Sequence, residues 1–359
     1  MLYKPDWEQA RARILAWWEG EIVDRPCLQV TAPRAGREAE FLKASHRPPD
    51  ISVKQWWTDV DYVVQRTARR IEATFWGGEA FPLFNPNLGP DVFAAFFGAP
   101  LRFLDTETNW VQHIVDDWAD FPELRIDEGN PWYRLQLQLL RAAHEAGRGR
   151  WITGIPDTHA GGDALSALRG NERLCMDLYD SPDTVRRAVT ELVEGVKQVY
   201  DSYFAIVEPE QFGSSSGWLP SWHTGRSNAV QCDFIALVSP AMMQEFILPS
   251  IVEEARCLDR AIFHLDGPDA IKHLDALLQV PEIHAIQWVH GAGKGPMTRW
   301  VPLLRRIQAR GKSLHLSVTP PEVPAVLEAL QPGGLMLHTS TESETEARDL
   351  LDSVARWQC

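Results

Sequence analysis

The sequence lacks the features that mark several large classes of protein. Its five cysteines are scattered and contain no CxxC pair, which argues against a disulfide framework and a structural zinc knuckle. No apolar run reaches the roughly 20 residues that a transmembrane helix needs. The first residues, Met-Leu-Tyr-Lys-Pro-Asp-Trp, have no basic-then-apolar signal pattern, so we expect a cytoplasmic protein.

Basic runs and nucleotide-binding motifs are also missing. The formal net charge is −14, which repels nucleic acid and anionic membranes, so we expect a small-molecule substrate and neither of those partners. No GxGxxG follows the first strand, and the glycine-rich segment 291–295 lacks the Lys-Ser/Thr ending of a phosphate-binding loop. We therefore expect no nucleotide cofactor.

A regular alternation of strands and helices begins near residue 80. Short apolar runs rich in β-formers are followed by amphipathic stretches, which indicates a parallel sheet with helices outside it. About eight such units favour an α/β fold of the (β/α)8 TIM-barrel type. The predicted strands are 81–84, 151–155, 211–214, 230–234, 261–265, 285–289, 313–318 and 335–338, and the predicted helices are 131–146, 182–204, 240–259, 269–278, 297–310, 321–330 and 343–357.

Residues 1–75 are predicted to form a helical segment packed on a barrel of residues 76–359. Helices are expected over 7–18 and 53–75, with a short strand at 27–32 and a loop at 34–49. Most of the 15 tryptophans are expected in the core, while Trp110, Trp218 and Trp288 are candidates for lining a substrate pocket. The aromatic-rich N-terminal helices are compatible with a homodimer.

Polar residues recur where the predicted strands end, and barrel enzymes place catalysis at the carboxyl ends of their strands. His264 and Asp266 lie two apart on one strand, so both side chains point to the same side. An imidazole and a carboxylate suit either a zinc-type ion or an acid/base pair. The alternative is a structural pair in which the carboxylate orients the histidine.

Asp157 and His159 form a second such pair, followed by a glycine pair that allows close backbone approach to a ligand. We predict catalytic roles for both, or helix capping by Asp157 or, better, by Asp163. Asp233 is balanced between a site role and a structural one. Other strand ends supply further candidates for substrate binding, namely Gln287, Trp288 and His290.

The order of these motifs resembles that of the uroporphyrinogen decarboxylase superfamily, which includes corrinoid-linked methyltransferases. The matching residues are Asp157-Thr-His159, Leu168-Arg169-Gly170, Gln231-Cys-Asp233-Phe, Ser239-Pro240, Phe263-His264-Leu-Asp266-Gly267-Pro268 and Ile286-Gln287-Trp288. The resemblance covers most of the chain and is clearest from about 80 to 356. It implies a (β/α)8 barrel with an additional N-terminal helical segment and a site in the barrel mouth.

The methyltransferases of that superfamily hold zinc with a His-x-Cys pair and a distant cysteine. Here His264 matches, Asp266 replaces the paired cysteine, and no cysteine lies near Thr341, where the distant one would fall. His338 is the nearest alternative ligand. The resemblance therefore implies either a harder metal site built from His264, Asp266 and His338, with zinc as one candidate ion, or no metal.

Three functions stay open at this stage. The first is methyl transfer or demethylation of a small polar molecule, with a metal held by His and Asp and a corrinoid protein as a candidate partner. The second is a metal-free decarboxylase or lyase in which Asp157 or Asp233 stabilises a cationic intermediate. The third is a non-catalytic barrel that binds a small molecule.

Overall fold

The computed structural model describes residues 1–121, 123–159, 161–207 and 213–356. Its strands are β1 (Cys27–Pro33), β2 (Thr74–Gly78), β3 (Leu83–Phe84), β4 (Leu101–Phe103), β5 (Asn109–Val111), β6 (Ile152–Thr153), β7 (Ser227–Gln231), β8 (Arg260–Asp266), β9 (Ile283–Val289), β10 (Ser313–Ser317) and β11 (Leu335–Ser340). The longer helices are α1 (Trp7–Trp18), α2 (Glu38–Ser45), α3 (Val53–Thr58), α4 (Val60–Glu72), α5 (Val92–Phe96), α6 (Pro131–Gly147), α7 (Gly161–Arg169), α8 (Asn171–Asp180), α9 (Pro182–Val207), α12 (Leu248–Arg256), α13 (Leu274–Leu278), α14 (Val301–Gln308), α15 (Val323–Ala329) and α16 (Glu344–Ala355).

The main sheet has seven strands in the order β2-β1-β11-β10-β9-β8-β7. All neighbours pair in parallel except β1 and β2, which are antiparallel. A second parallel pair joins β3 to β6, and single bridges follow it at Ile155–Ser216 and Ser214–His223. Within the described residues no ladder joins this pair to the main sheet, so the closed (β/α)8 barrel stays a prediction, whereas the mixed α/β class with a parallel sheet is confirmed.

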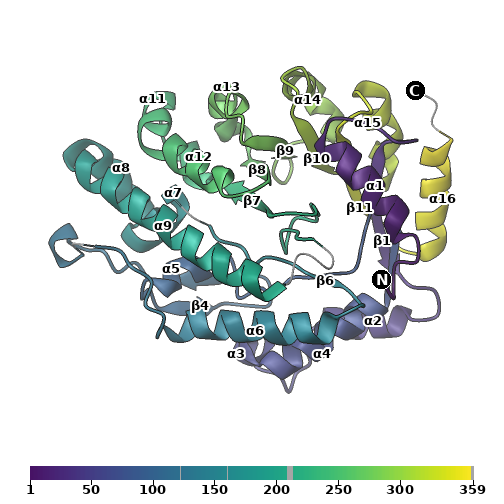
Figure 1. The fold of residues 1–359 in the computed structure, drawn as a ribbon, viewed down its shortest axis with the longest axis horizontal. Coiled ribbons are helices and arrows are strands. Elements are labelled where there is room, and N and C mark those ends of the chain that lie inside the picture. The colour runs from purple at the N-terminus through teal and green to yellow at the C-terminus, as the bar shows by residue number, and fades with distance from the viewer. Residues whose placement is uncertain (122, 160, 208–212, 357–359) are drawn as a thin grey trace.

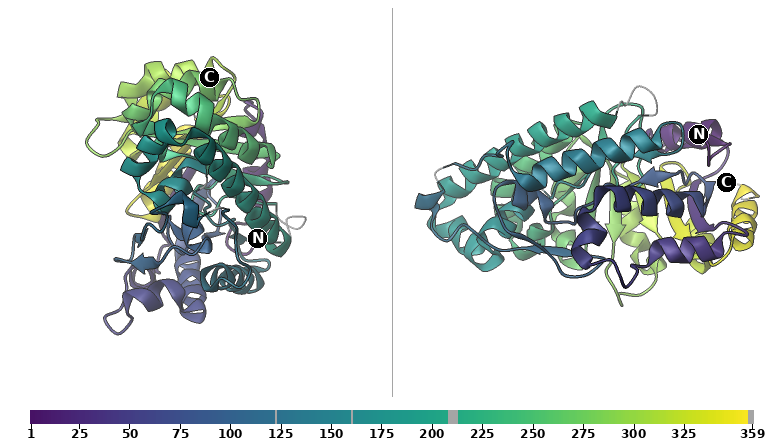
Figure 2. Two further views of the ribbon diagram at one scale, coloured as in Figure 1. Left: turned by 90° about the vertical axis from the view of Figure 1, so that its left-hand side faces the viewer. Right: turned by 90° about the horizontal axis from the view of Figure 1, so that it is seen from below.

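Helices flank the sheet on opposite sides of the molecule. Figure 1 shows α13, α14 and α15 along one side and α3, α4 and α6 along the other. The same separation is visible in the left view of Figure 2, where the blue-violet helices of residues 38–72 lie below the C-terminal half. Strand β1 nevertheless pairs with β11, so the first and last strands of the chain are neighbours in one sheet.

Several predicted elements differ from the observed ones. The predicted loop at 34–49 contains helix α2, and the predicted helix at 53–75 is broken at Asp59, whose carboxylate caps α4 by accepting from the Tyr62 amide. The segment Thr74–Gly78 is a strand because it pairs with β1, a long-range contact that local periodicity does not reveal.

The predicted strands after residue 200 are mostly confirmed. Strands β8 to β11 begin and end within about two residues of the predictions. Strand β7 starts at Ser227 and stops at Gln231, earlier than predicted, because the next residues enter the 3-10 helix η2 (Asp233–Leu237). Positions 211 and 212 of the predicted strand 211–214 lie outside the described residues.

Tryptophans of α1 close the amino end of the sheet. Trp7, Trp17 and Trp18 are buried in a cluster with inward-facing residues from the starts of the strands, such as Ile262 and Met336. The indole nitrogens of Trp17 and Trp18 donate to the carbonyls of Leu314 and Trp222 at 3.0 and 2.9 Å. Because this end is filled with aromatic side chains, a ligand site on the sheet axis belongs at the carboxyl end.

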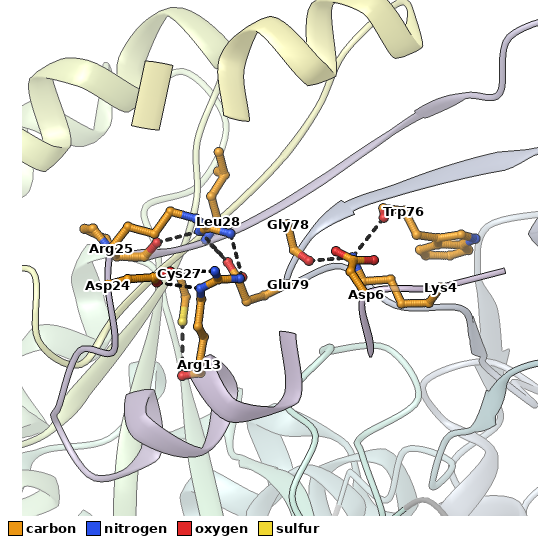
Figure 3. A network of polar contacts seen from close by, with 11 residues as sticks. Lys4, Asp6, Arg13, Asp24, Arg25, Cys27, Leu28, Trp76, Gly78 and Glu79 are labelled. Carbon is orange, nitrogen blue, oxygen red and sulfur yellow. Dashed lines mark hydrogen bonds and ion pairs between the residues drawn. The ribbon is translucent and has the colours of Figure 1, made fainter. Parts of the chain in front are cut away.

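A buried ion-pair network ties α1 to the edge of the sheet (Figure 3). The fully buried Glu79 accepts two hydrogen bonds from Arg25 at 2.8 and 2.7 Å, one from Arg13 at 3.2 Å and one from the Leu28 amide at 2.7 Å. Beside it the buried Lys4 donates to the Gly78 carbonyl at 2.6 Å, and burial lowers the pKa of this lysine. The charges are compensated within the network, so its role is structural.

Candidate functional site

Four neighbouring strands carry Gln231, His264, Gln287 and His315 at one level of the sheet. Gln231 pairs in register with His264, His264 with Gln287, and Gln287 with His315. Residues in register on parallel strands point to the same face. This face therefore presents a row of amides and imidazoles just above the tryptophan-filled end.

Three ionisable side chains converge at the carboxyl end of this row. One potential ligand atom each from Asp233, His264 and Asp266 lies within 4.8 Å of the others. His264 and Asp266 come from the end of β8, as their spacing predicts, and Asp233 begins η2 after β7. Burial and the Asp163 carboxylate raise the pKa of Asp233 to about 6. One imidazole and two carboxylates in this arrangement could hold a divalent cation.

Asp163 positions Asp233 through the backbone. Its carboxylate accepts from the amides of Asp233 and Phe234 at 2.9 and 2.8 Å. Asp163 lies inside α7, so it caps the distant helix η2 and not the start of its own helix, which was the predicted target. After β8, Gly267 adopts a φ of 77°, which turns the chain away from the site at a position that favours glycine.

His264 is oriented by two neighbours. Its Nδ1 lies 2.6 Å from Oε1 of Gln287, and its ring stands at 90° to Trp218 with the ring centres 5.1 Å apart. Gln287 is buried while His264 is half-buried. The predicted substrate-binding residues Gln287 and Trp218 are thus both at the site, where they contact the histidine.

Asp157 and His159 form the second predicted pair. Nε2 of His159 lies 2.7 Å from an oxygen of Asp157, and its Nδ1 is 3.9 Å from Asp163. Burial lowers the pKa of His159, but the charges of Asp157, Asp163 and Asp233 outweigh that effect and raise it to about 9. The ring is therefore an imidazolium at neutral pH. Gln231 approaches both Asp157 oxygens at 3.5 Å.

A pocket of about 370 Å³ lies beside these groups. Its lining includes the side chains of His159, Asp163, Asp233, Asp91 and Trp110. None of the described residues that line it is a lysine or an arginine. Burial raises the pKa of Asp91. Trp110, predicted to line a substrate pocket, is in this wall and is 55% exposed.

Two carboxyl groups near the site were not predicted from the sequence. Asp91 follows a Gly-Pro turn and belongs to no recognisable motif. Glu254 lies on α12, is buried, and has a pKa that burial and the charges of Asp163 and Asp157 raise well above its usual value. Glu254 falls within a predicted amphipathic helix, where a charged residue gives no sign that it is buried. Neither Asp91 nor Glu254 could therefore be identified from the sequence.

Three further predicted residues, His338, Trp288 and His290, are not members of the group formed by Asp233, His264 and Asp266. Nδ1 of His338 lies 3.3 Å from Oε1 of Gln29, and the ring of this histidine stacks against His315. Trp288 alternates with Gln287 on β9, so it points to the other face, where it is fully buried against Trp300. The ring of His290 also packs against Trp300, with the ring centres 6.3 Å apart. The structure therefore gives Trp288 a packing role in place of the predicted substrate contact.

Comparisons with known proteins give a single kind of match. No family model and no curated protein sequence matches the chain. Among solved structures it is similar to a methyltransferase from Methanosarcina mazei, with a TM-score of 0.66, 12% identity, and coverage of 96% of this chain and 98% of that chain. This likeness shows a common fold over nearly the whole length.

No described helix is long and apolar enough to cross a membrane.

Proposed function

We propose that the chain is a metal-assisted methyltransferase or demethylase of the uroporphyrinogen decarboxylase superfamily that acts on a small polar molecule. The observation that carries the proposal is the convergence of Asp233, His264 and Asp266 at the carboxyl end of the sheet. The proposed architecture is a closed barrel whose sheet includes β1, which pairs with β11, so the division at residue 75 that the sequence suggested does not separate the barrel from the N-terminal segment. The methyltransferase fold of the structural neighbour supports the proposal.

The donor set fits a divalent cation that accepts nitrogen and oxygen ligands. Asp233 takes the place that the sequence suggested for His338, so the ligands are one imidazole and two carboxylates. An imidazole with two carboxylates is compatible with zinc, and it suits a harder ion such as Mn²⁺ better than a thiolate-rich site would. A bound ion would polarise an oxygen or nitrogen of the substrate.

His159 is proposed as the proton donor of the site. It lines the pocket and its pKa is raised to about 9, so it carries a proton at neutral pH. When a methyl group leaves a heteroatom as a cation equivalent, that atom keeps the bonding electron pair and requires a proton. Asp157 holds the imidazolium in place through the 2.7 Å contact.

The charge of the pocket favours demethylation over the decarboxylase alternative. A polycarboxylate substrate needs several cationic partners, whereas the described lining sets three carboxyl groups against the imidazolium of His159 and has no lysine or arginine. We therefore propose a neutral or cationic substrate. A corrinoid protein as methyl carrier and a homodimeric assembly are further parts of the proposal that come from the sequence resemblance.

A demethylation assay tests this function. Purified protein is supplied with a divalent cation, cob(I)alamin and a panel of methyl ethers, thioethers and methylamines, and products are identified by mass spectrometry. We expect a demethylated product that is lost in His264→Ala and retained in His46→Ala, a variant of an exposed histidine. A decarboxylated product from a panel member that carries a carboxylate would favour the decarboxylase alternative, and binding of a panel compound without any product would favour the non-catalytic alternative.

A further inference from the structure

Three buried glutamines face the site from the strands beneath it. Gln231 approaches Asp157, Gln287 approaches His264, and Gln29 approaches both His338 and His315 at 3.3 and 3.4 Å. All three glutamine residues are at most 6% exposed. A buried amide without a hydrogen bond destabilises the fold, so the partner of each glutamine is a specific feature of these strands.

The contact from Gln287 is the shortest of these and has a definite polarity. An amide oxygen can only accept a hydrogen bond, so the 2.6 Å contact requires that Nδ1 of His264 carries the hydrogen. In the neutral imidazole the other nitrogen, Nε2, then has the lone pair. Histidines that bind metals commonly donate their second nitrogen to such an acceptor, which fixes the tautomer and the ring orientation.

The surroundings leave the ring little freedom to depart from this arrangement. Strand pairing places His264 and Gln287 directly opposite each other on β8 and β9. Trp218 meets the imidazole edge-on at 5.1 Å. The backbone register and the indole together restrict rotation of the ring, so the hydrogen bond is a consequence of the fold.

We infer that Gln287 is a positioning residue that fixes His264 in the Nδ1–H tautomer. Nε2 of His264 then has its lone pair available to bind a cation together with Asp233 and Asp266. This role replaces the substrate contact that the sequence predicted for Gln287. The role in metal binding rests on the proposed function, whereas the tautomer is a property of the metal-free protein. The two parts can therefore be tested separately.

The test uses two substitutions at one position and one matched control. Gln287→Met keeps the length of the side chain but removes the acceptor, and Gln287→Glu keeps an acceptor at the same place. Gln136→Met is the control, because Gln136 is a fully buried glutamine whose amide donates to the Pro86 carbonyl away from the site. Nitrogen-15 NMR of histidine-labelled, metal-free protein at pH 8 reports the tautomer, and competition titration gives the dissociation constants for Zn²⁺ and Mn²⁺.

The expected result is an Nδ1–H tautomer for His264 in the wild type and in Gln136→Met, and a mixture in Gln287→Met. Metal affinity should fall about 10- to 100-fold in Gln287→Met and stay within a few-fold of wild type in Gln287→Glu and Gln136→Met. An Nε2–H tautomer in the wild type, or unchanged metal affinity in Gln287→Met, would overturn the inference. A wild type that shows the expected tautomer but binds neither ion would refute metal assistance while leaving the tautomer assignment intact.

Discussion

Protonation of His159 makes the stability of the protein depend on pH in a defined window. The pKa of His159 is raised from 6.5 to about 9 in the folded state, although its burial alone would lower it, because Asp157 lies 2.7 Å away. A difference of about 2.5 pH units at 1.36 kcal/mol per unit corresponds to about 3 kcal/mol. The side chain is only 21% exposed, so screening by solvent is modest.

The direction of the effect follows from proton linkage. Below pH 6.5 the ring is protonated in both the folded and the unfolded chain, and the full stabilisation is present. Between pH 6.5 and about 9 only the folded protein keeps the proton, so this contribution declines as pH rises and is gone above about 9.

Urea unfolding at pH 6, 7.5 and 9.5 measures this contribution. Groups that do not interact with His159 titrate equally in wild type and in His159→Gln, so they cancel in the difference in free energy of unfolding between the two proteins. Asp233, whose pKa the His159 charge lowers, is the neighbour whose titration changes with the substitution. We expect that difference to shrink by about 3 kcal/mol from pH 6 to pH 9.5. His46→Gln, a substitution of an exposed histidine, should show no such change. A constant difference for His159→Gln across this range would refute the assignment of a stable imidazolium.

Two further predictions separate structural from functional residues. Glu79→Gln leaves Arg25 buried without its charge partner, so the free energy of unfolding should fall by about 3–5 kcal/mol. Glu8→Gln removes an exposed ion pair and should cost at most about 1 kcal/mol. Urea unfolding midpoints compare the two variants, and equal losses would contradict a dominant role for the buried network. Trp288→Ala should lower the free energy of unfolding by about 3–5 kcal/mol, because Trp288 is fully buried. Trp110→Ala should lower it by about 0.5 kcal/mol or less but raise the KM of the demethylation, because Trp110 is exposed in the pocket wall. The reverse pattern would show that Trp288, and not Trp110, contacts the substrate.

Local patterns in the sequence predicted the second half of the sheet well. Strands β8 to β11 are short, apolar and bounded by helices, so their positions follow from periodicity alone. The spacing of His264 and Asp266 likewise placed two site residues on one side of β8. These features depend on neighbours in the sequence, which is why they could be found without coordinates.

Features that depend on distant contacts could not be predicted in this way. Strand β2 exists because it pairs with β1. Asp233 was a candidate from the sequence, but the sequence did not show that Asp163, 70 residues earlier, accepts a hydrogen bond from its amide. His338 has the right residue type but faces Gln29. Register between strands decides such cases, and the sequence alone carries no direct record of register.

The proposed function depends on one divalent cation bound jointly by Asp233, His264 and Asp266. Elemental analysis after dialysis against zinc or manganese, followed by removal of free ion, measures this most directly. We expect close to one bound ion per chain in the wild type and in His338→Ala, and a loss of at least tenfold in affinity in His264→Ala and Asp233→Asn. Absence of bound metal in the wild type, or loss of metal in His338→Ala with retention in Asp233→Asn, would contradict the account.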